Sequence, residues 1–217
     1  QVSANWMAAS GENSDDFAFR SGVEALSKIA VDLKVSIPVG KDSLSMRTKW
    51  SENNSDYEVS SPLSGVITAM APVDDVTESV TPELNTSDDT SILLIKLNNK
   101  NRLAGSIFSE ITETKYQHTP DIDDIEVFEK LFSGIQNLLK NKKILAMHDI
   151  SDGGLITTLL EMCFTKKVGM RMDLDDSSGV NEFLFSEEIG FAIQIKKNNL
   201  DEITNTLTNE NLSLIHI

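Results

Sequence analysis

A polar, proline-containing stretch between residues 72 and 89 constrains the fold of this chain more than any other feature. It holds Pro72 and Pro82, many Ser and Thr residues and several acids, with little apolar content. Clusters of this composition mark loops and boundaries between folded units. A chain of 217 residues is long enough for one to two domains. The sequence therefore predicts two units, residues 1–80 and residues 81–217.

The second predicted unit alternates strands with helices. Apolar residues recur at helical spacing over residues 125–140, and apolar runs at 91–97 and 190–196 indicate buried strands. The remaining expected elements are strands at 144–147, 168–174 and 212–217, and helices at 103–113, 155–164 and 200–207. This alternation predicts an α/β domain of mixed layers.

The first predicted unit contains one helix and a hairpin. Apolar residues at helical spacing predict a helix over residues 14–33, followed by a short apolar run at 35–39. Residues 43–50 alternate as a strand, a polar turn follows at 52–56, and residues 57–71 are its expected return strand. This pattern is typical of a β-hairpin.

Charge and composition exclude several classes of function. Nineteen basic and 34 acidic residues give a net charge of −15, which disfavours sequence-independent binding of nucleic acid. No apolar run approaches the roughly 20 residues of a membrane span. The single cysteine, Cys163, allows no internal disulfide and fits a reducing compartment, so a cytoplasmic protein is expected. We also expect the sequence to be a fragment of a longer polypeptide, because it begins at Gln1 without Met.

Residues 147–154 carry the clearest candidate site. They lie between an expected strand and an expected helix, where free N–H groups and the positive helix end can meet an anion. Asp149 and Asp152 can bind a hard cation, and Ser151 can donate to a phosphate oxygen or cap the helix. The two glycines that follow would let backbone approach a ligand closely. The residues are equally compatible with a simple capped helix start whose N-cap is Asp152.

Two further segments are weaker candidates. Lys41, Asp42 and Ser43 follow a glycine at an expected strand junction, where a cation and a carboxylate could face one cleft. The glycine run of a P-loop is missing there, so the residues alone favour a surface turn with a solvated Lys41–Asp42 pair. In the second segment, Glu187 and Glu188 mark either a helix end or a carboxylate that faces a site.

Cysteine and histidine offer no clear alternative chemistry. Cys163 falls on the apolar side of an expected helix, so a core position is favoured over a nucleophile. His118 and His216 lack the spacing of metal ligands, so no zinc site is indicated.

Several phrases, taken in order along the chain, resemble one family. They are Ser3-Ala4-Asn5-Trp6-Met7-Ala8-Ala9, Ile37-Pro38-Val39-Gly40-Lys41-Asp42-Ser43-Leu44-Ser45-Met46, Ser61-Pro62-Leu63-Ser64, His148-Asp149-Ile150-Ser151-Asp152-Gly153-Gly154-Leu155 and Leu184-Phe185-Ser186-Glu187-Glu188-Ile189-Gly190. Together they are similar to the large, single-chain form of phosphoribosylformylglycinamidine synthase. That enzyme catalyses the glutamine-dependent, amidine-forming step of purine biosynthesis. The resemblance runs over nearly the whole chain, although residues 85–143 match mainly in pattern.

The resemblance implies a fold and a place in a larger enzyme. It implies an α/β fold of the aminoimidazole-ribonucleotide-synthetase type. Residues 1–80 would end an N-terminal-type domain, and residues 81–217 would form most of a C-terminal-type domain. The parent polypeptide would also carry a glutaminase domain. The family's glycine-rich nucleotide loop and a metal-binding Glu and Asn are not among these residues, so the piece would be inactive alone.

The resemblance also implies a reaction and a set of ligands. ATP activates the amide oxygen of formylglycinamide ribonucleotide, an iminophosphate forms, and ammonia from glutamine displaces phosphate to give the amidine and ADP. By motif match, Asp149 corresponds to a Mg²⁺ ligand and Ser151 to a nucleotide contact. Lys41, Asp42 and Ser43 would lie near a substrate or phosphate cleft, with Glu187 a weaker candidate.

Two alternatives stay open on the sequence. In the first, the chain is a non-catalytic half whose bound nucleotide supports the fold. In the second, it is a free-standing, metal-dependent hydrolase that uses His148, Asp149 and Asp152.

Overall fold

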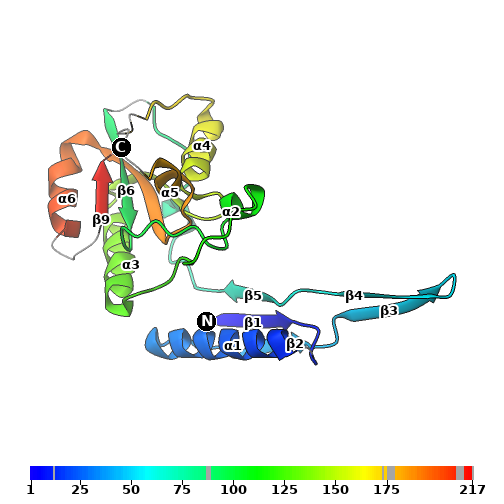
Figure 1. Cartoon of the computed structure of the whole chain (residues 1–217). Coiled ribbons are helices and arrows are strands. Elements are labelled where there is room, and N and C mark those ends of the chain that lie inside the picture. Colours follow the sequence, from blue (N-terminus) through cyan, green and yellow to red (C-terminus); the bar gives the residue numbers. More distant parts are fainter. Residues whose placement is uncertain (12, 87–88, 173, 175–178, 209–212, 217) are drawn as a thin grey trace. The chain divides into compact units, whose positions relative to one another are not determined.

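The computed structural model describes residues 1–11, 13–86, 89–172, 174, 179–208 and 213–216. The chain divides into two compact units, Gln1–Val76 and Thr77–Ile217 (Figure 1). The boundary predicted from composition, between residues 80 and 81, lies four residues further along. A short 3₁₀ helix, η1 (Val76–Glu78), begins at the last residue of unit 1.

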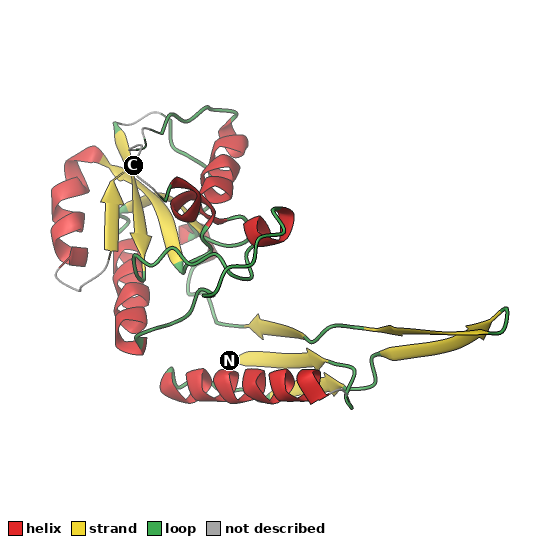
Figure 2. Cartoon of the chain, in the orientation of Figure 1, coloured by secondary structure: helices red, strands yellow, loops and turns green. Residues whose placement is uncertain are grey.

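Unit 1 combines a small sheet, one long helix and a separate hairpin (Figure 2). Its elements are β1 (Val2–Met7), α1 (Asn13–Asp32), β2 (Val39–Ser43), β3 (Arg47–Glu52), β4 (Ser55–Ser60) and β5 (Ser64–Ala69). In the sheet, β1 lies between β2 and β5, parallel to β2 and antiparallel to β5. The sequence had predicted no strand at β1.

The helix predicted over residues 14–33 is confirmed as α1, and Trp6 of β1 is its main anchor. The Trp6 ring meets the Phe19 ring edge-on, with centroids 5.8 Å apart. A Cβ atom at Gly22 would lie only 2.9 Å from the same indole, so the helix approaches the sheet closely at this point. Part of the apolar stripe stays outside this contact, because Phe17 is 73% exposed.

The predicted hairpin is confirmed in its turn and its pairing, but not in the length of its strands. β3 and β4 pair antiparallel across Asn53 and Asn54, which both have positive φ, as a tight hairpin turn requires. The predicted strand 43–50 is interrupted between β2 and β3, and Pro62 lies in the break between β4 and β5. Proline cannot donate to a strand ladder, which accounts for the second break.

Unit 2 is built on an antiparallel sheet of four strands in the order β7-β8-β6-β9. Its elements are β6 (Thr90–Lys96), α2 (Ile107–Ile111), α3 (Ile125–Lys140), β7 (Ile144–Asp149), α4 (Gly154–Lys166), α5 (Val180–Phe185), β8 (Gly190–Lys196), η2 (Lys197–Asn199), α6 (Leu200–Thr208) and β9 (Ser213–His216). The sequence predictions for β6, α3, β7, α4, β8, α6 and β9 are confirmed to within a few residues.

Two sequence predictions for unit 2 are wrong. The expected helix over residues 103–113 is reduced to α2, because the preceding residues form a loop whose Ala104 amide donates to the carbonyl of His118. No strand forms in the described part of 168–174. Val168, Met170 and Met172 instead pack on a hydrophobic cluster from irregular backbone. Their alternation therefore reflects burial of every second side chain without strand pairing.

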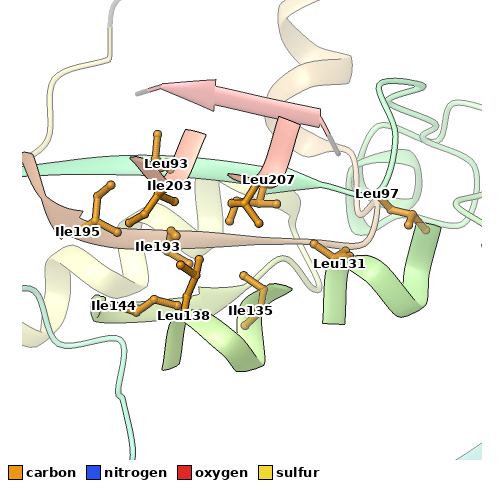
Figure 3. Close-up of a cluster of buried hydrophobic side chains, with 11 residues drawn as sticks. Leu93, Leu97, Leu131, Ile135, Leu138, Ile144, Ile193, Ile195, Ile203 and Leu207 are labelled. Carbon is orange, nitrogen blue, oxygen red and sulfur yellow. The ribbon is translucent and has the colours of Figure 1, made fainter. Parts of the chain in front are cut away.

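The sheet of unit 2 carries a hydrophobic cluster on each face. The first, shown in Figure 3, joins Leu93 and Ile95 of β6 to α3 and α6. The second joins Leu94 of β6 to α4 and includes Cys163, which is buried as predicted. Burial also raises the pKa of the Cys163 thiol. Among the described residues, no helix is both long enough and apolar enough to cross a membrane.

Lys96 ends β6 with a buried amine. Its Nζ donates to Oδ1 of Asn101, and the residue is only 3% exposed. Burial lowers the pKa of Lys96 from its ordinary 10.5 to about 8, although the negative charge of Glu188 opposes this shift. The folded protein therefore bears the cost of a buried charge below pH 8.

This burial predicts a pH dependence of stability. Between pH 8 and 10.5 the unfolded chain binds more protons at Lys96 than the folded chain, so the free energy of unfolding should rise with pH in this window. The gain is at most about 3 kcal/mol. Chemical unfolding of the wild type and of Lys96→Met across this range measures it. A stability difference between the two that does not change with pH would contradict the prediction.

Candidate nucleotide and metal site

The end of β7 presents the Asp149 carboxylate to solvent, next to the turn that leads into α4. Asp149 is the last residue of β7, and its side chain is 65% exposed. The backbone beneath it is fixed, because Thr158 Oγ1 donates to the Asp149 carbonyl at 3.0 Å and the Ile150 amide donates to the Gly190 carbonyl at 2.9 Å. A rigid backbone with an exposed carboxylate is suited to holding a hard cation.

His148 lies between two carboxylates. Its Nδ1 is 3.2 Å from Oδ1 of Asp149, and its Nε2 is 2.8 Å from Oε2 of Glu161 on α4. The imidazole is 16% exposed, so both contacts limit the rotation of a largely buried ring. Sequence patterns did not point to Glu161. Its one available signal was that Glu161 is the single acidic residue of α4.

The helix start differs from the predicted cap. The N-cap of α4 is Gly153, which has a φ of +85°. Among the described residues, no side chain makes a capping hydrogen bond at this end of the helix. The prediction of Asp152 as N-cap is therefore wrong. The left-handed conformation of Gly153 turns the chain into the helix one residue later, which leaves Ser151 and Asp152 exposed. The Ser151 carbonyl accepts a hydrogen bond from the Gly154 amide at 3.0 Å.

The backbone of Gly154 lies close to another segment of the same chain, the backbone of Leu184 and Phe185. It has a φ of +72°, and a Cβ atom there would lie 2.6 Å from the carbonyl carbon of Phe185 and 2.8 Å from the carbonyl oxygen of Leu184. The glycine therefore allows α4 to start directly against the end of α5. The sequence had assigned this role to contact with a ligand.

The Glu187 carboxylate binds at the start of α4, where the sequence predicted that free N–H groups could meet an anion. Its Oε1 accepts hydrogen bonds from the amides of Gly153 and Ile107, each at 2.9 Å. The segment around it was predicted as either a helix end or a carboxylate facing a site. The helix end is confirmed, because α5 stops at Phe185, and the carboxylate faces the first residue before α4.

Glu188 points into the protein and anchors a loop. Its carboxylate is 1% exposed and accepts from Arg102 Nε at 2.5 Å, from Arg102 Nη2 at 2.8 Å and from Asn98 Nδ2 at 3.1 Å. Burial by itself raises the pKa of Glu188, but the hydrogen bonds from Arg102 and Asn98 outweigh burial and hold it below its ordinary value. Sequence patterns did not point to Arg102, which also pairs with Asp123.

Asp149 is the residue at the end of β7 that could share a magnesium ion with a bound nucleotide. Within the described part of the chain, no three His, Cys, Asp or Glu side chains lie close enough together to hold a metal ion. The hydrolase alternative, which needs His148, Asp149 and Asp152 to act together, stays a prediction. Mg²⁺ in nucleotide sites commonly takes one or two carboxylates and completes its shell with phosphate oxygens and water. Asp149 fits as one such ligand.

The residues Lys41, Asp42 and Ser43 lie in unit 1 on β2, not in a surface turn. Nζ of Lys41 donates to Oγ of Ser43 at 2.8 Å, so these two side chains share one face of the strand. Asp42 lies on the opposite face of the strand. There it lines an apolar groove together with Trp6 of β1 and Phe19 of α1. The structure thus brings Lys41 and Ser43 together and separates Asp42 from them.

Comparison with known families matches both units. A family model described as FGAR-AT PurM_N-like domain matches residues 1–72. A second, described as AIR synthase related protein, C-terminal domain, matches residues 89–217, which is more than half of the chain.

Solved structures share this fold at low sequence identity. Phosphoribosylformylglycinamidine synthase II from Thermotoga maritima has a TM-score of 0.60 and 10% identity, over 99% of this chain and 32% of that chain. T. maritima PurL complexed with ATP has a TM-score of 0.58 and 11% identity, over 99% of this chain and 32% of that chain. Its complex with FGAR has a TM-score of 0.56 and 11% identity, over 99% of this chain and 34% of that chain. Escherichia coli HypE, a hydrogenase maturation protein, has a TM-score of 0.61 and 12% identity, over 99% of this chain and 66% of that chain.

The chain spans about a third of the length of the T. maritima structures it matches. At 10–12% identity these likenesses establish the fold and leave the activity open. The family match is independent of them and covers the whole described sheet of unit 2. The chain therefore belongs to the AIR synthase-related family and has its mixed α/β fold.

Proposed function

We propose that this chain is part of a phosphoribosylformylglycinamidine synthase of the large, single-chain form. In this role it contributes to a magnesium–nucleotide site of an ATP-dependent ligase that makes formylglycinamidine ribonucleotide, with ammonia drawn from glutamine by a glutaminase domain of the same polypeptide. The exposed Asp149 carboxylate, held on fixed backbone between β7 and α4, is the observation that carries the proposal.

Within this proposal, each residue of the turn has a chemical role. Asp149 would hold Mg²⁺, which neutralises phosphate charge when the nucleotide is bound. The exposed Ser151 hydroxyl would donate to a phosphate oxygen. Because Glu187 already accepts from the Gly153 amide, the α4 start contributes less to anion binding than the sequence suggested. Phosphate binding would then depend on the cation and on Ser151.

The match over residues 1–72 favours this function over the others that share the fold. HypE has the same fold and a different described role, so the fold alone does not distinguish them. The model that matches unit 1 is described as an FGAR-AT PurM_N-like domain, and solved PurL structures are described as complexes with ATP or with FGAR. Lys41 and Ser43, on one face of β2, are the residues of unit 1 that we assign to a substrate or phosphate cleft.

Replacing Asp149 by asparagine tests the proposal. Asparagine keeps the shape but removes the charge, so the Mg²⁺-dependent affinity for ADP should fall roughly 10- to 100-fold, the range seen when metal sites lose a supporting group. Isothermal titration on the natural polypeptide that contains these residues, with and without Mg²⁺, measures the change. Asp201→Asn on α6 is the charge control and should bind as the wild type does.

The same variant separates a catalytic from a structural nucleotide site. A catalytic site predicts that turnover per folded molecule falls together with ADP affinity. A structural site predicts that nucleotide content and thermal stability fall, while turnover per folded molecule is kept. Unchanged nucleotide content and unchanged turnover would show that Asp149 is not a ligand in either site.

A further inference from the structure

Three consecutive residues after α5 connect separate parts of unit 2. Oγ of Ser186 donates to the Arg102 carbonyl at 3.1 Å, and Glu188 accepts from the Arg102 side chain. Between them, Glu187 turns the other way and reaches the starts of two helices. The segment 186–188 thus fastens both the loop before α2 and the turn before α4.

A single oxygen of Glu187 joins these two helix starts. Oε1 accepts from the Ile107 amide at 2.9 Å and from the Gly153 amide at 2.9 Å. Both amides belong to the free N–H groups that a helix start leaves without an intrahelical partner. A carboxylate satisfies them better than a neutral acceptor, since hydrogen bonds to charged groups are shorter and stronger.

The helix α5 packs against both α2 and α4 next to this contact. The rings of Phe108 on α2 and Phe185 on α5 stack with centroids 4.5 Å apart and planes at 18°. On the other side, Gly154 places the start of α4 against the backbone of Leu184 and Phe185. A shorter side chain at this position therefore either loses one of the two amides or moves a helix start.

The turn that carries Ser151 is held at two points. The Ile150 amide donates to the Gly190 carbonyl at one end, and the Gly153 amide donates to Glu187 at the other. Ser151 and Asp152 lie exposed between these points. We propose that Glu187 is a positioning residue that sets the conformation of the Asp149–Gly153 turn by joining it to the start of α2, an inference that rests on the proposed function of this turn.

Two substitutions separate positioning from direct ligation. Glu187→Gln keeps an oxygen acceptor at the same reach and removes the charge. Glu187→Asp keeps the charge but shortens the side chain by one methylene, so it cannot reach both amides. Positioning therefore predicts that the Gln variant retains Mg²⁺-dependent ADP affinity within threefold of the wild type, while the Asp variant loses at least fivefold. A residue that ligates the cation itself requires the opposite order, and that order would overturn the proposal.

Hydrogen exchange provides a readout that does not depend on nucleotide. In the natural polypeptide that contains these residues, Glu187→Ala should speed amide exchange at least tenfold both in segment 105–109 and in segment 149–155. Glu110→Gln, an exposed carboxylate on α2, is the matched control and should leave both segments unchanged. If Glu187→Ala fails to fold, the Asp variant, which cannot reach both amides, should speed exchange in at least one of the two segments, and the Gln variant in neither.

The outcomes of the two measurements are distinct. Wild-type protein without Mg²⁺-dependent ADP binding would end the proposed function, whereas the paired exchange would still support the joining role of Glu187. In Glu187→Ala, exchange that stays unchanged in both segments, or rises in only one, would overturn the positioning role even if ADP binds normally. If the Asp variant has to be used instead, exchange that stays unchanged in both segments would overturn it.

Discussion

Replacing Glu188 by alanine is expected to destabilise unit 2 by about 3 kcal/mol, the low end of the range for breaking a buried ion pair. The substitution removes the acceptor of two Arg102 side-chain bonds and one Asn98 bond. Arg102, which is 12% exposed, is left with Asp123 as its remaining carboxylate partner in this network. That remaining pair is why the expected loss stays near the low end.

The measurement has to report on unit 2. Both tryptophans, Trp6 and Trp50, lie in unit 1, so their fluorescence does not follow the unfolding of interest. Amide exchange of β6 and β8 under native conditions gives the free energy of opening of their sheet. Glu129→Ala, an exposed position on α3, is the control and should change stability by less than about 0.5 kcal/mol. A loss below 1 kcal/mol for Glu188→Ala would contradict the role of the buried pair.

Replacing Gly154 by alanine is expected to cost about 2–5 kcal/mol and to displace α4 from α5. The left-handed conformation at φ +72° disfavours any side chain with a Cβ atom. The added methyl would also lie 2.6 Å from the carbonyl carbon of Phe185, and neither backbone can give way as a side-chain end can. Thermal unfolding and amide exchange of α4 measure the two effects.

Gly169 provides the matched control for this substitution. A Cβ atom there has nothing within 4 Å, and its φ lies outside the positive range. Gly169→Ala should therefore change the free energy of unfolding by no more than about 0.5 kcal/mol. If Gly154→Ala were as mild as Gly169→Ala, the close approach of α4 to α5 would not be a constraint on the fold.

Sequence patterns predicted unit 2 well where the apolar period was long and unbroken. α3 was found at its full length, because five apolar residues follow one stripe. In the structure, Asp124 caps its start. Short elements were missed for a physical reason. α5 has six residues, too few to show a repeating helical pattern of apolar residues. It is held by the Phe108–Phe185 contact and the nearby glycine, which only the tertiary fold supplies.

The candidate site was located from sequence, but its internal bonding was not. The segment 148–154 was selected for its carboxylates, hydroxyl and glycines, and the structure places Asp149 and Ser151 there as exposed groups. That Glu187 would satisfy the Gly153 amide depends on a contact between residues far apart in the chain. Local spacing carries no information about such contacts, so the sequence left an N-cap by Asp152 open as an alternative.

The two-sided core of unit 2 has a consequence for strand alignment. β6 is buried on both faces, so sliding it by one residue against β8 would exchange Leu93 and Leu94 between two apolar clusters without exposing either. Hydrophobicity alone does not forbid this slip. The buried amide of Gln194 does, because it donates to the Asn85 carbonyl at 2.8 Å and to Oγ1 of Thr90 at 2.9 Å.

A slipped β8 would leave that amide buried without partners, at a cost of about 1–3 kcal/mol for each lost group. The Asn85 amide, which donates to Oε1 of Gln194 at 2.7 Å, would lose its acceptor as well. One polar side chain in an otherwise apolar sheet thus works as an alignment pin: it favours a single pairing among alternatives that bury equal apolar area.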